Sequence, residues 1–418
     1  MDKLRITGGR RLKGRVPVAG AKNAALPALA ATLLTEDRVE LSNLPRVRDV
    51  RTMLRVLEQL GATVTDRGDG TASVQVARLQ SFEAPYDLVR TMRASVLVLG
   101  PLLARYGRAR VSLPGGCAIG ERPINLHIEG LHKMGAEIRI EHGYVDATAK
   151  RLRGASFAFP LETVTGTENL MMAAVLAEGT TRLSNCAREP EIVDLADLLT
   201  AMGAAITGAG TGEIVIEGGK PLHGAAHGVI PDRIEAGTYL VAGALVGDDV
   251  EVLGARPDHL DALLTQLAAC GVAVTATPDG LRVAAPRALA AHDLRTSPHP
   301  GFPTDMQAQY MTLMTQAKGV ARIDETVFER RFMHVGELHR MGADIRIEGR
   351  SAVVTGSTRL TGAQVMATDL RASACLVLAG LVADGPTLVD RVYHLDRGYE
   401  SMETKLGALG ASIERIRA

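Results

Sequence analysis

The chain has 418 residues, too many for one compact core and suited to two domains of roughly 200 residues. Its 47 basic and 47 acidic side chains balance, which excludes a broadly basic nucleic-acid-binding protein. No apolar stretch reaches the roughly 18 residues of a membrane span, residues 1–6 do not resemble a secretion signal, and the four cysteines form no CxxC pair, so we expect a soluble cytoplasmic protein.

One unit recurs six times along the chain. In each copy an amphipathic helix ends at a glycine, a natural helix stop, and continues into an alternating strand; these glycines are spaced by 68 to 74 residues. Each copy is predicted to have the order β-α-β-α-β-β. The six glycines are Gly61, Gly135, Gly203, Gly271, Gly342 and Gly410, and the first, apolar helix of each copy is expected at 27–34, 94–104, 169–177, 238–246, 306–316 and 372–383.

The sixth copy is shorter than the others, because the chain ends at Ala418 just after its first closing strand. The missing strand has a counterpart in Leu4–Thr7, so we expect the N-terminal stretch to complete this copy. Three copies per domain predict an α/β protein with one domain at 22–230 and a second made of 1–21 and 231–418. A cleft between two similar domains is a common place for a small-molecule site.

Charged side chains recur just before the first helix of each copy. Lys22, Arg93 and Arg371 are expected at helix starts, where the helix dipole disfavours cations and favours anionic ligands. An anionic ligand would explain them. Three other copies carry an aspartate there, for which helix capping is an equally good explanation: Asp232, Asp305 and Asp369.

An arginine recurs in the loop before the second helix of every copy. A surface ion pair would explain any single one of them. Arginines in all six equivalent loops look more like a positively charged rim around a cleft. They are Arg48, Arg122, Arg188, Arg256, the pair Arg330 and Arg331, and Arg397.

The loop 114–123 contains three glycines together with Cys117 and Arg122. Glycines predict a mobile segment that can close over a ligand. A nearby cation lowers the pKa of a thiol and makes it reactive, and an incidental thiol is the alternative.

The histidines show no metal-ligand spacing, so no metal site is predicted. The remaining cysteines lie in apolar contexts and are expected to be buried: Cys186, Cys270 and Cys375.

Six motifs spread over the whole chain resemble the UDP-N-acetylglucosamine enolpyruvyl transferases, a branch of the enolpyruvyl transferase family. The motifs read GAKNA at 20–24, LPGGCAIG at 113–120, FPTDMQ at 302–307, RFMHV at 331–335, DLRAS at 369–373 and DRGYE at 396–400. The resemblance implies two inside-out α/β barrels with three of the six repeats in each.

The resemblance also implies a reaction. The enolpyruvyl group of phosphoenolpyruvate would pass to the 3′-hydroxyl of UDP-N-acetylglucosamine (UDP-GlcNAc), releasing phosphate by addition and elimination, in the first committed step of peptidoglycan synthesis. Cys117 would be the general acid and the target of fosfomycin, and Asp305 would accept the hydroxyl proton. The partners would be these small molecules only, with no cofactor, no metal, no nucleic acid and no membrane span.

Binding residues follow from the same resemblance. The phosphoenolpyruvate site would contain Lys22, Asn23, Arg122, Arg331, Arg371 and Arg397, of which Lys22 and Arg397 are also expected to be catalytic. The UDP-GlcNAc site would contain Asn23, Arg93, Arg122, Pro123, Ile124, Asn125, Leu126, Thr163, Val164, Asp305 and Val327, with Asp369 as a further site residue.

The sequence departs from the family pattern at residues 161–167, where some members have a lysine in place of Leu161, and at Asn125, where some have an aspartate. These changes affect the expected nucleotide contacts. Two alternatives remain open: the sister family, 5-enolpyruvylshikimate-3-phosphate synthase, which lacks the glycine-loop cysteine, and a non-catalytic UDP-sugar-binding protein.

Overall fold

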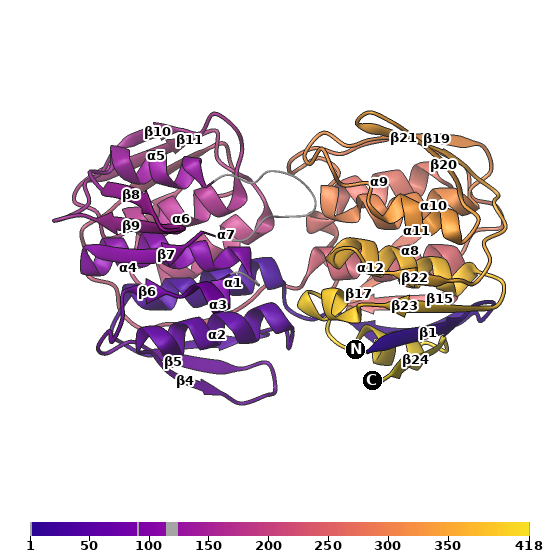
Figure 1. Cartoon of the computed structure of the whole chain (residues 1–418), viewed down its shortest axis with the longest axis horizontal. Helices are drawn as coiled ribbons and strands as arrows, with labels where there is room; N and C mark the ends of the chain where they lie inside the picture. The colour runs from indigo at the N-terminus through magenta and orange to yellow at the C-terminus, as the bar shows by residue number, and fades with distance from the viewer. Residues whose placement is uncertain (1, 90–91, 114–123, 418) are drawn as a thin grey trace. The chain divides into compact units, whose positions relative to one another are not determined.

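Six four-stranded sheets carry the strands of the computed structural model, which describes residues 2–89, 92–113 and 124–417 (Figure 1). Helices connect the strands within every sheet, so the fold is mixed α/β, as the sequence predicts. Contacts divide the described residues into two units. The 20–230 unit contains those between Gly20 and Ile230, and the 231–417 unit contains those from Pro231 onward together with the stretch up to Ala19.

The three sheets of the 20–230 unit have one pairing pattern: a parallel pair followed by two antiparallel pairs. The strands, in sheet order, are β14 (Ala226–Gly228), β3 (Val39–Ser42), β5 (Ala72–Gln75) and β4 (Thr63–Asp66); β6 (Glu83–Ala84), β7 (Arg108–Ser112), β9 (Tyr144–Thr148) and β8 (Glu137–Glu141); and β10 (Ser156–Ala158), β11 (Thr180–Ser184), β13 (Glu213–Glu217) and β12 (Ala205–Thr207).

The sheets of the 231–417 unit have the same pattern, and the N-terminal stretch supplies strands to two of them. The strand β1 (Lys3–Thr7) lies between β23 (Pro386–Asp390) and β24 (Ser412–Ile416), next to β22 (Gln364–Met366). The strand β2 (Leu12–Pro17) runs parallel to β15 (Gly247–Leu253), followed by β17 (Gly280–Val283) and β16 (Val274–Thr277). The third sheet contains β18 (Leu294–Arg295), β19 (Val320–Asp324), β21 (Ser351–Thr355) and β20 (Asp344–Glu348).

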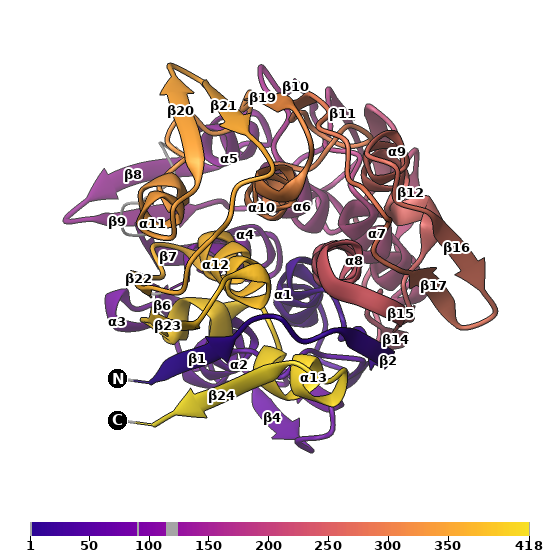
Figure 2. The same cartoon turned by 90° about the vertical axis from the view of Figure 1, so that its right-hand side faces the viewer.

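Apolar helices fill the middle of each unit. In the 231–417 unit α8 (Arg233–Val246), α10 (Gln307–Gln316) and α12 (Leu370–Val382) pack against one another, with the sheets outside them (Figure 2). A helix that is apolar on all sides must be buried, and every residue from Arg371 to Leu381 is. The corresponding helices of the 20–230 unit are α1 (Lys22–Ala31), α4 (Leu99–Tyr106) and α6 (Val164–Ala174).

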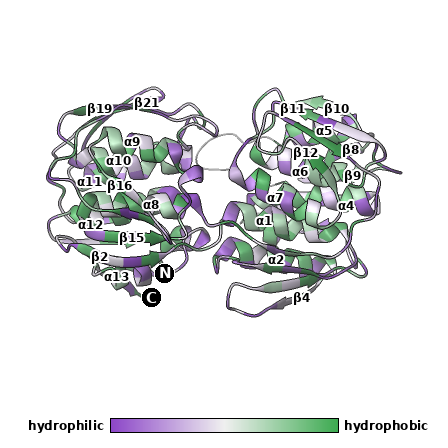
Figure 3. Cartoon of the chain, turned by 180° about the vertical axis from the view of Figure 1, so that it is seen from behind, coloured by the Kyte–Doolittle hydropathy of each residue, from purple (hydrophilic) through white to green (hydrophobic). Residues whose placement is uncertain are grey.

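Amphipathic helices accompany the sheets. In α2 (Arg48–Leu60) Met53, Leu57 and Leu60 are buried whereas Arg55 and Glu58 are exposed, and hydrophobic stretches run through the helices and strands of both units (Figure 3). The others are α5 (Asn125–Lys133), α7 (Pro190–Ala201), α9 (Asp261–Ala269), α11 (His334–Arg340) and α13 (Met402–Ala408), with the short α3 (Tyr86–Val89). Within the described ranges, no helix has the length and apolar character needed to cross a bilayer.

Three of the central helices, α1, α6 and α8, begin earlier than the sequence predicts. The helix α1 starts at Lys22, so Pro27 lies inside the helix and not at its first position. The helix α8 starts just after Asp232, which caps it, and α6 starts after Thr163. As a result, the residues that the sequence places in loops before these helices lie in their first turns.

Candidate active site

Three charged side chains of the 231–417 unit meet at Asp305. This residue lies in a short 3₁₀ turn, η4 (Thr304–Met306), directly before α10. Its Oδ2 accepts hydrogen bonds from Nε and Nη2 of Arg371, at 3.0 and 2.7 Å. Its Oδ1 accepts a hydrogen bond of 2.6 Å from Nη2 of Arg331. The sequence predicted these three residues for one site, and the structure brings them together.

Burial makes this pairing strong. Arg371 is only 3% exposed and Arg331 only 6%, so neither guanidinium has water to replace a lost partner. Burial alone would favour a neutral acid at Asp305, but the charges of Arg371 and Arg331 hold its pKa well below the ordinary value. Asp305 is therefore an anion held by two cations.

The other two aspartates at helix starts have a different role. Asp369 Oδ1 accepts hydrogen bonds from the backbone N–H groups of Arg371 and Ala372, at 2.8 and 3.0 Å. Asp232 caps α8 in the same way. The capping explanation is thus correct for Asp232 and Asp369, but Asp305 binds side chains and caps nothing.

Two further predicted residues lie in loops of this unit. Arg397 is half-buried at the end of η5 (Val392–Arg397), and the neighbouring Asp396 accepts hydrogen bonds of 2.6 and 3.0 Å from Arg415 on β24. Val327 lies in the loop after β19, where its backbone N–H donates to Glu325 at 2.8 Å. Arg415 thereby connects the turn that carries Arg397 to a strand.

In the 20–230 unit, Lys22 is the first residue of α1, with Asn23 following it. Nζ of Lys22 lies 3.3 Å from Oδ2 of Asp49 on α2, and the two side chains are 12% and 5% exposed. A lysine at a helix start is disfavoured by the dipole, and Asp49 offsets that cost. Arg93 begins the 3₁₀ segment η2 (Arg93–Val98), directly before α4.

A neutral hydrogen-bonded network lies at the start of α6. Asn169 accepts a hydrogen bond from Gly100 N and donates to Val96 O, which fixes the orientation of its amide. Its Nδ2 therefore donates to Nδ1 of His127, at 2.8 Å, so the imidazole carries its proton on Nε2, 3.3 Å from Thr165 Oγ1. Burial, together with the charge of Arg93, lowers the pKa of His127 to about 3.

The predicted nucleotide contacts of this unit lie near that network. Ile124 is nearly buried just before α5, and Asn125 and Leu126 form the first turn of the helix. Thr163 caps α6 by accepting a hydrogen bond of 3.2 Å from Gly166 N, and Val164 is the first residue of α6. Cys117, Arg122 and Pro123 lie outside the described residues.

The segment that departs from the family pattern begins in a surface loop at residues 161–163 and continues into the first turn of α6. Leu161 is 72% exposed, and Glu162 lies 3.7 Å from Arg188. An exposed leucine gains nothing from packing, so its position leaves it available to a ligand or to solvent.

The other cysteines are buried, as the sequence predicts: Cys186, Cys270 and Cys375. Burial raises the pKa of each thiol above its ordinary value. In the part of the chain that the structure describes, no group of three or more His, Cys, Asp or Glu side chains is arranged to hold a metal ion.

Several buried residues near these sites were not predicted. Glu168 on α6 is 1% exposed, and burial and the charges of Glu191 and Glu189 raise its pKa well above the usual value. Glu325 is 1% exposed as well. The side chains that bind Glu325, those of Thr296 and Thr304, lie 29 and 21 residues away in the chain, so no local pattern marks this residue.

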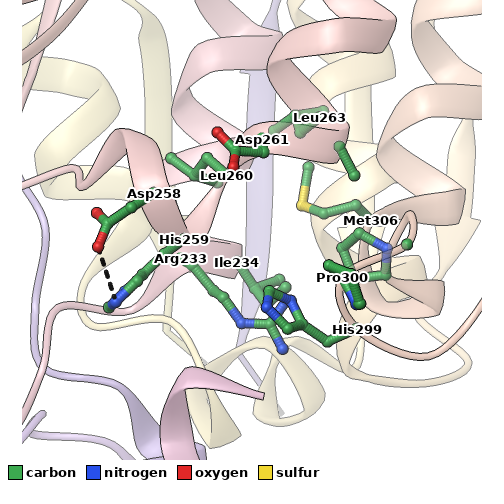
Figure 4. A pocket seen from close by; sticks show the side chains of 13 residues that line it. Arg233, Ile234, Asp258, His259, Leu260, Asp261, Leu263, His299, Pro300 and Met306 are labelled. Carbon is green, nitrogen blue, oxygen red and sulfur yellow. Dashed lines mark ion pairs between the residues drawn. The ribbon is translucent and has the colours of Figure 1, made fainter. Parts of the chain in front are cut away.

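A small pocket in the 231–417 unit was also not predicted (Figure 4). It is formed by the first turn of α8, the segment 258–263 and the loop before η4. Nε2 of His259 lies 3.8 Å from Oδ2 of Asp258, and Pro303 and Met306 connect the pocket to the turn that carries Asp305.

These features can be compared with known proteins. A family model described as EPSP synthase (3-phosphoshikimate 1-carboxyvinyltransferase) matches residues 6–406. The chain therefore belongs to this family of enolpyruvyl transferases. Among its relatives, the UDP-N-acetylglucosamine 1-carboxyvinyltransferase of Magnetococcus marinus is 59% identical over 417 residues, which cover 100% of both chains.

Solved structures agree with the fold. The enolpyruvyl transferase NikO from Streptomyces tendae has a TM-score of 0.90 and 27% identity, with 100% of this chain and 99% of NikO covered. EPSP synthase from Acinetobacter baumannii has a TM-score of 0.77, with full coverage of both chains. Its identity of 18% supports a shared fold and nothing more.

Proposed function

We propose that this chain transfers the enolpyruvyl group of phosphoenolpyruvate to the 3′-hydroxyl of UDP-GlcNAc and releases phosphate. The observation that carries this proposal is the 59% identity, over the full length of both chains, to a protein named UDP-N-acetylglucosamine 1-carboxyvinyltransferase. Shikimate-3-phosphate is the competing acceptor, because the family model is named after its enzyme.

The reaction has two steps in which every proton is accounted for. In the addition, the sugar oxygen bonds to C2 of phosphoenolpyruvate, Asp305 accepts the hydroxyl proton, and Cys117 donates a proton to the methylene carbon. The product is a tetrahedral ketal with a methyl group. In the elimination, the methyl group returns a proton to the Cys117 thiolate, the C2–O bond to phosphate breaks, and the carbon–carbon double bond re-forms. The departing phosphate takes the proton that Asp305 had accepted.

The pairing of Asp305 bears on its role as a base. Because two guanidinium groups stabilise the anion, Asp305 is ionised and able to accept a proton, but its low pKa makes it a weak base. We propose that phosphoenolpyruvate draws Arg331 and Arg371 toward its own negative charges. The pKa of Asp305 would then rise when both substrates are bound, which is when a base is needed.

Cations would hold the anionic substrate. We assign Lys22, Arg122 and Arg397 to the phosphate of phosphoenolpyruvate, with Asn23 beside Lys22. Charge-assisted hydrogen bonds are the strong ones, and they stabilise the charge that develops on the departing phosphate.

The nucleotide sugar would contact the first turns of α5 and α6 and the loop after β19. The exposure of Leu161 and its proximity in sequence to Thr163 support a contact between this loop and the uridine end. We propose the following contacts: Asn23, Arg93, Arg122, Pro123, Ile124, Asn125, Leu126, Thr163, Val164, Asp305 and Val327, with Asp369 fixing Arg371.

We also propose that the six sheets are six copies of one β-α-β-α-β-β repeat. Their common pairing pattern and the regular spacing of the helix-ending glycines support this. Each domain would be an inside-out barrel of three copies, with boundaries at 22–230 and at 1–21 plus 231–418.

The proposed reaction belongs to peptidoglycan synthesis in the cytoplasm. It needs no cofactor or metal, because acid, base and cations come from the chain. The partners are the two small-molecule substrates.

Phosphate release from phosphoenolpyruvate tests the function directly. We expect release with UDP-GlcNAc and none with shikimate-3-phosphate. Release with shikimate-3-phosphate alone would assign the chain to the sister activity, and no release with either acceptor would favour a UDP-sugar-binding protein.

The role of Cys117 has its own test. Fosfomycin should inactivate the enzyme with time and add to Cys117, which peptide mass spectrometry can locate. Cys117→Ser should lose most turnover and still bind UDP-GlcNAc. An adduct on a buried cysteine, or loss of sugar binding in the variant, would contradict the assignment.

A further inference from the structure

Glu325 is a buried carboxylate that accepts four hydrogen bonds from neutral groups. It directly follows β19 and is 1% exposed. Its Oε1 accepts from Thr296 Oγ1 at 3.0 Å and from the backbone N–H groups of Val327 and Phe328 at 2.8 and 3.0 Å. Its Oε2 accepts from Thr304 Oγ1 at 2.9 Å. An acceptor with this many donors suits an ionised carboxylate.

The bond to Thr304 orients the hydroxyl of this residue. Because Thr304 donates its proton to Glu325, its oxygen lone pairs remain available to Arg331, whose Nη1 donates to them at 3.0 Å. The other terminal nitrogen of Arg331 donates to Asp305. A continuous chain of hydrogen bonds therefore runs from Glu325 through Thr304 and Arg331 to Asp305.

A second support of Arg331 also depends on Glu325. The ring of Phe328 lies 5.4 Å from Cζ of Arg331, within the range of a cation–π contact. The backbone of Phe328 is held by Glu325. Glu325 thus fixes both the hydroxyl and the aromatic ring against which the buried guanidinium lies.

We infer that Glu325 is a positioning residue for the transfer reaction, an inference that rests on the proposed function. It holds Arg331, and through Arg331 the carboxylate of Asp305, in one orientation. It also fixes the backbone of Val327, so one carboxylate sets both the base and a proposed sugar contact. Glu325 acts through these neighbours and touches neither substrate.

The first test is Glu325→Gln, which keeps the shape and replaces one acceptor oxygen by a donor. At least one of the four hydrogen bonds is lost, and hydrogen bonds to charged groups each stabilise by about 1.5–3 kcal/mol. We expect kcat to fall about 10–100-fold, with a raised KM for UDP-GlcNAc. The matched control is Glu348→Gln on β20, an exposed residue paired with Arg346, which should keep wild-type kinetics.

A double-mutant cycle separates positioning from simple loss of structure. Thr304→Val removes the hydroxyl, and Thr304→Ser retains it and should restore most of the activity. If Glu325 acts through Thr304, the double variant Glu325→Gln with Thr304→Val should be no slower than Glu325→Gln alone. If the decrease in kcat of the double variant equals the product of the two single decreases, the inference is wrong. Should Glu325→Gln fail to fold, a Thr304→Val variant with wild-type kcat would overturn it equally.

A second measurement does not depend on the activity. Amide hydrogen exchange in the substrate-free protein should be about tenfold faster at Val327 and Phe328 in Glu325→Gln, and unchanged in Glu348→Gln. If the wild-type protein releases no phosphate, the proposed function fails. The exchange measurement then still tests whether Glu325 fixes the backbone of Val327 and Phe328. If the wild type is active and a folded Glu325→Gln has wild-type kcat and exchange, the inference about Glu325 is wrong.

Discussion

The cluster around Asp305 in the 231–417 unit and the network around His127 in the 20–230 unit bury polar groups in opposite ways. In the 231–417 unit, the anion Asp305 is paired with two cations, Arg331 and Arg371, which leaves one positive charge in excess. In the 20–230 unit, His127 and Asn169 form a network without net charge. A buried charge is tolerated only with a partner, whereas neutral groups need only hydrogen bonds. The first arrangement is therefore more sensitive to the loss of one member.

The largest effect should come from breaking the charged cluster with Asp305→Asn. Loss of a general base lowers the rate about 10²–10⁴-fold. The change also leaves Arg331 and Arg371 without a counter-charge. Because Asp305 is 26% exposed, we expect destabilisation somewhat below the ~3–5 kcal/mol of a fully buried pair.

Phosphate release and urea unfolding measure these two effects of Asp305→Asn separately. Asp384→Asn is the matched control, because this exposed residue forms an ion pair with Arg359 on the surface. A variant that keeps more than a tenth of the wild-type rate would contradict the role of Asp305 as the base.

An intermediate effect is expected at Lys22 in the 20–230 unit. If Lys22 binds phosphoenolpyruvate as proposed, Lys22→Gln removes a charge-assisted hydrogen bond to it, and KM should rise roughly 10–100-fold. Asp49→Asn leaves the lysine in place and should change KM less. Steady-state kinetics at saturating UDP-GlcNAc measure both variants, and a larger effect of Asp49→Asn would show that Lys22 has only a structural role.

The buried histidines predict a loss of stability in acid. The folded pKa is about 3 for His127 and about 4 for His334, both lowered mainly by burial, against about 6.5 in the unfolded chain. Between pH 6.5 and 4 the unfolded state binds more protons. The free energy of unfolding should thus fall with falling pH by up to about 1.4 kcal/mol per unit for each histidine.

Urea unfolding at several pH values measures the contribution of His127. The variant His127→Gln keeps an acceptor for Asn169 and should lose about half of this slope. The exposed His223→Gln is its control and should keep all of it. An unchanged slope in His127→Gln would show that His127 is not the buried neutral group described above.

The smallest expected effects concern the helix caps. Asp369 accepts two backbone N–H groups and carries a charge that suits the helix start, whereas Thr163 accepts one. Asp369→Ala should cost about 1–2 kcal/mol and Thr163→Ala about 0.5–1 kcal/mol. Thr52→Ala, inside α2, should be nearly neutral. The reverse order of the two caps, measured by urea unfolding, would contradict the comparison.

The repeating glycines and apolar helices predict the mixed α/β fold, because they mark helix ends and buried helices that recur at regular intervals along the chain. Helix starts were predicted less well. The sequence predicted the first apolar helix at 27–34, but α1 starts at Lys22 and contains Pro27 in its interior.

Of the site residues, the charged cluster was predictable as a set of residue types but not as a geometry. Asp305 and Asp369 both precede a helix, and the ion pairs that Arg331 and Arg371 form with Asp305 after folding distinguish it from the cap. Glu325 was missed for the same reason, since its partners Thr296 and Thr304 adjoin it only after folding.

The central claim is that UDP-GlcNAc is the acceptor of the enolpyruvyl group. A competition experiment with phosphoenolpyruvate and equal concentrations of UDP-GlcNAc and shikimate-3-phosphate tests it most directly, with products identified by mass spectrometry. We predict that only UDP-GlcNAc gains the enolpyruvyl group. An enolpyruvyl product of shikimate-3-phosphate, or no enolpyruvyl product at all, would contradict the proposal.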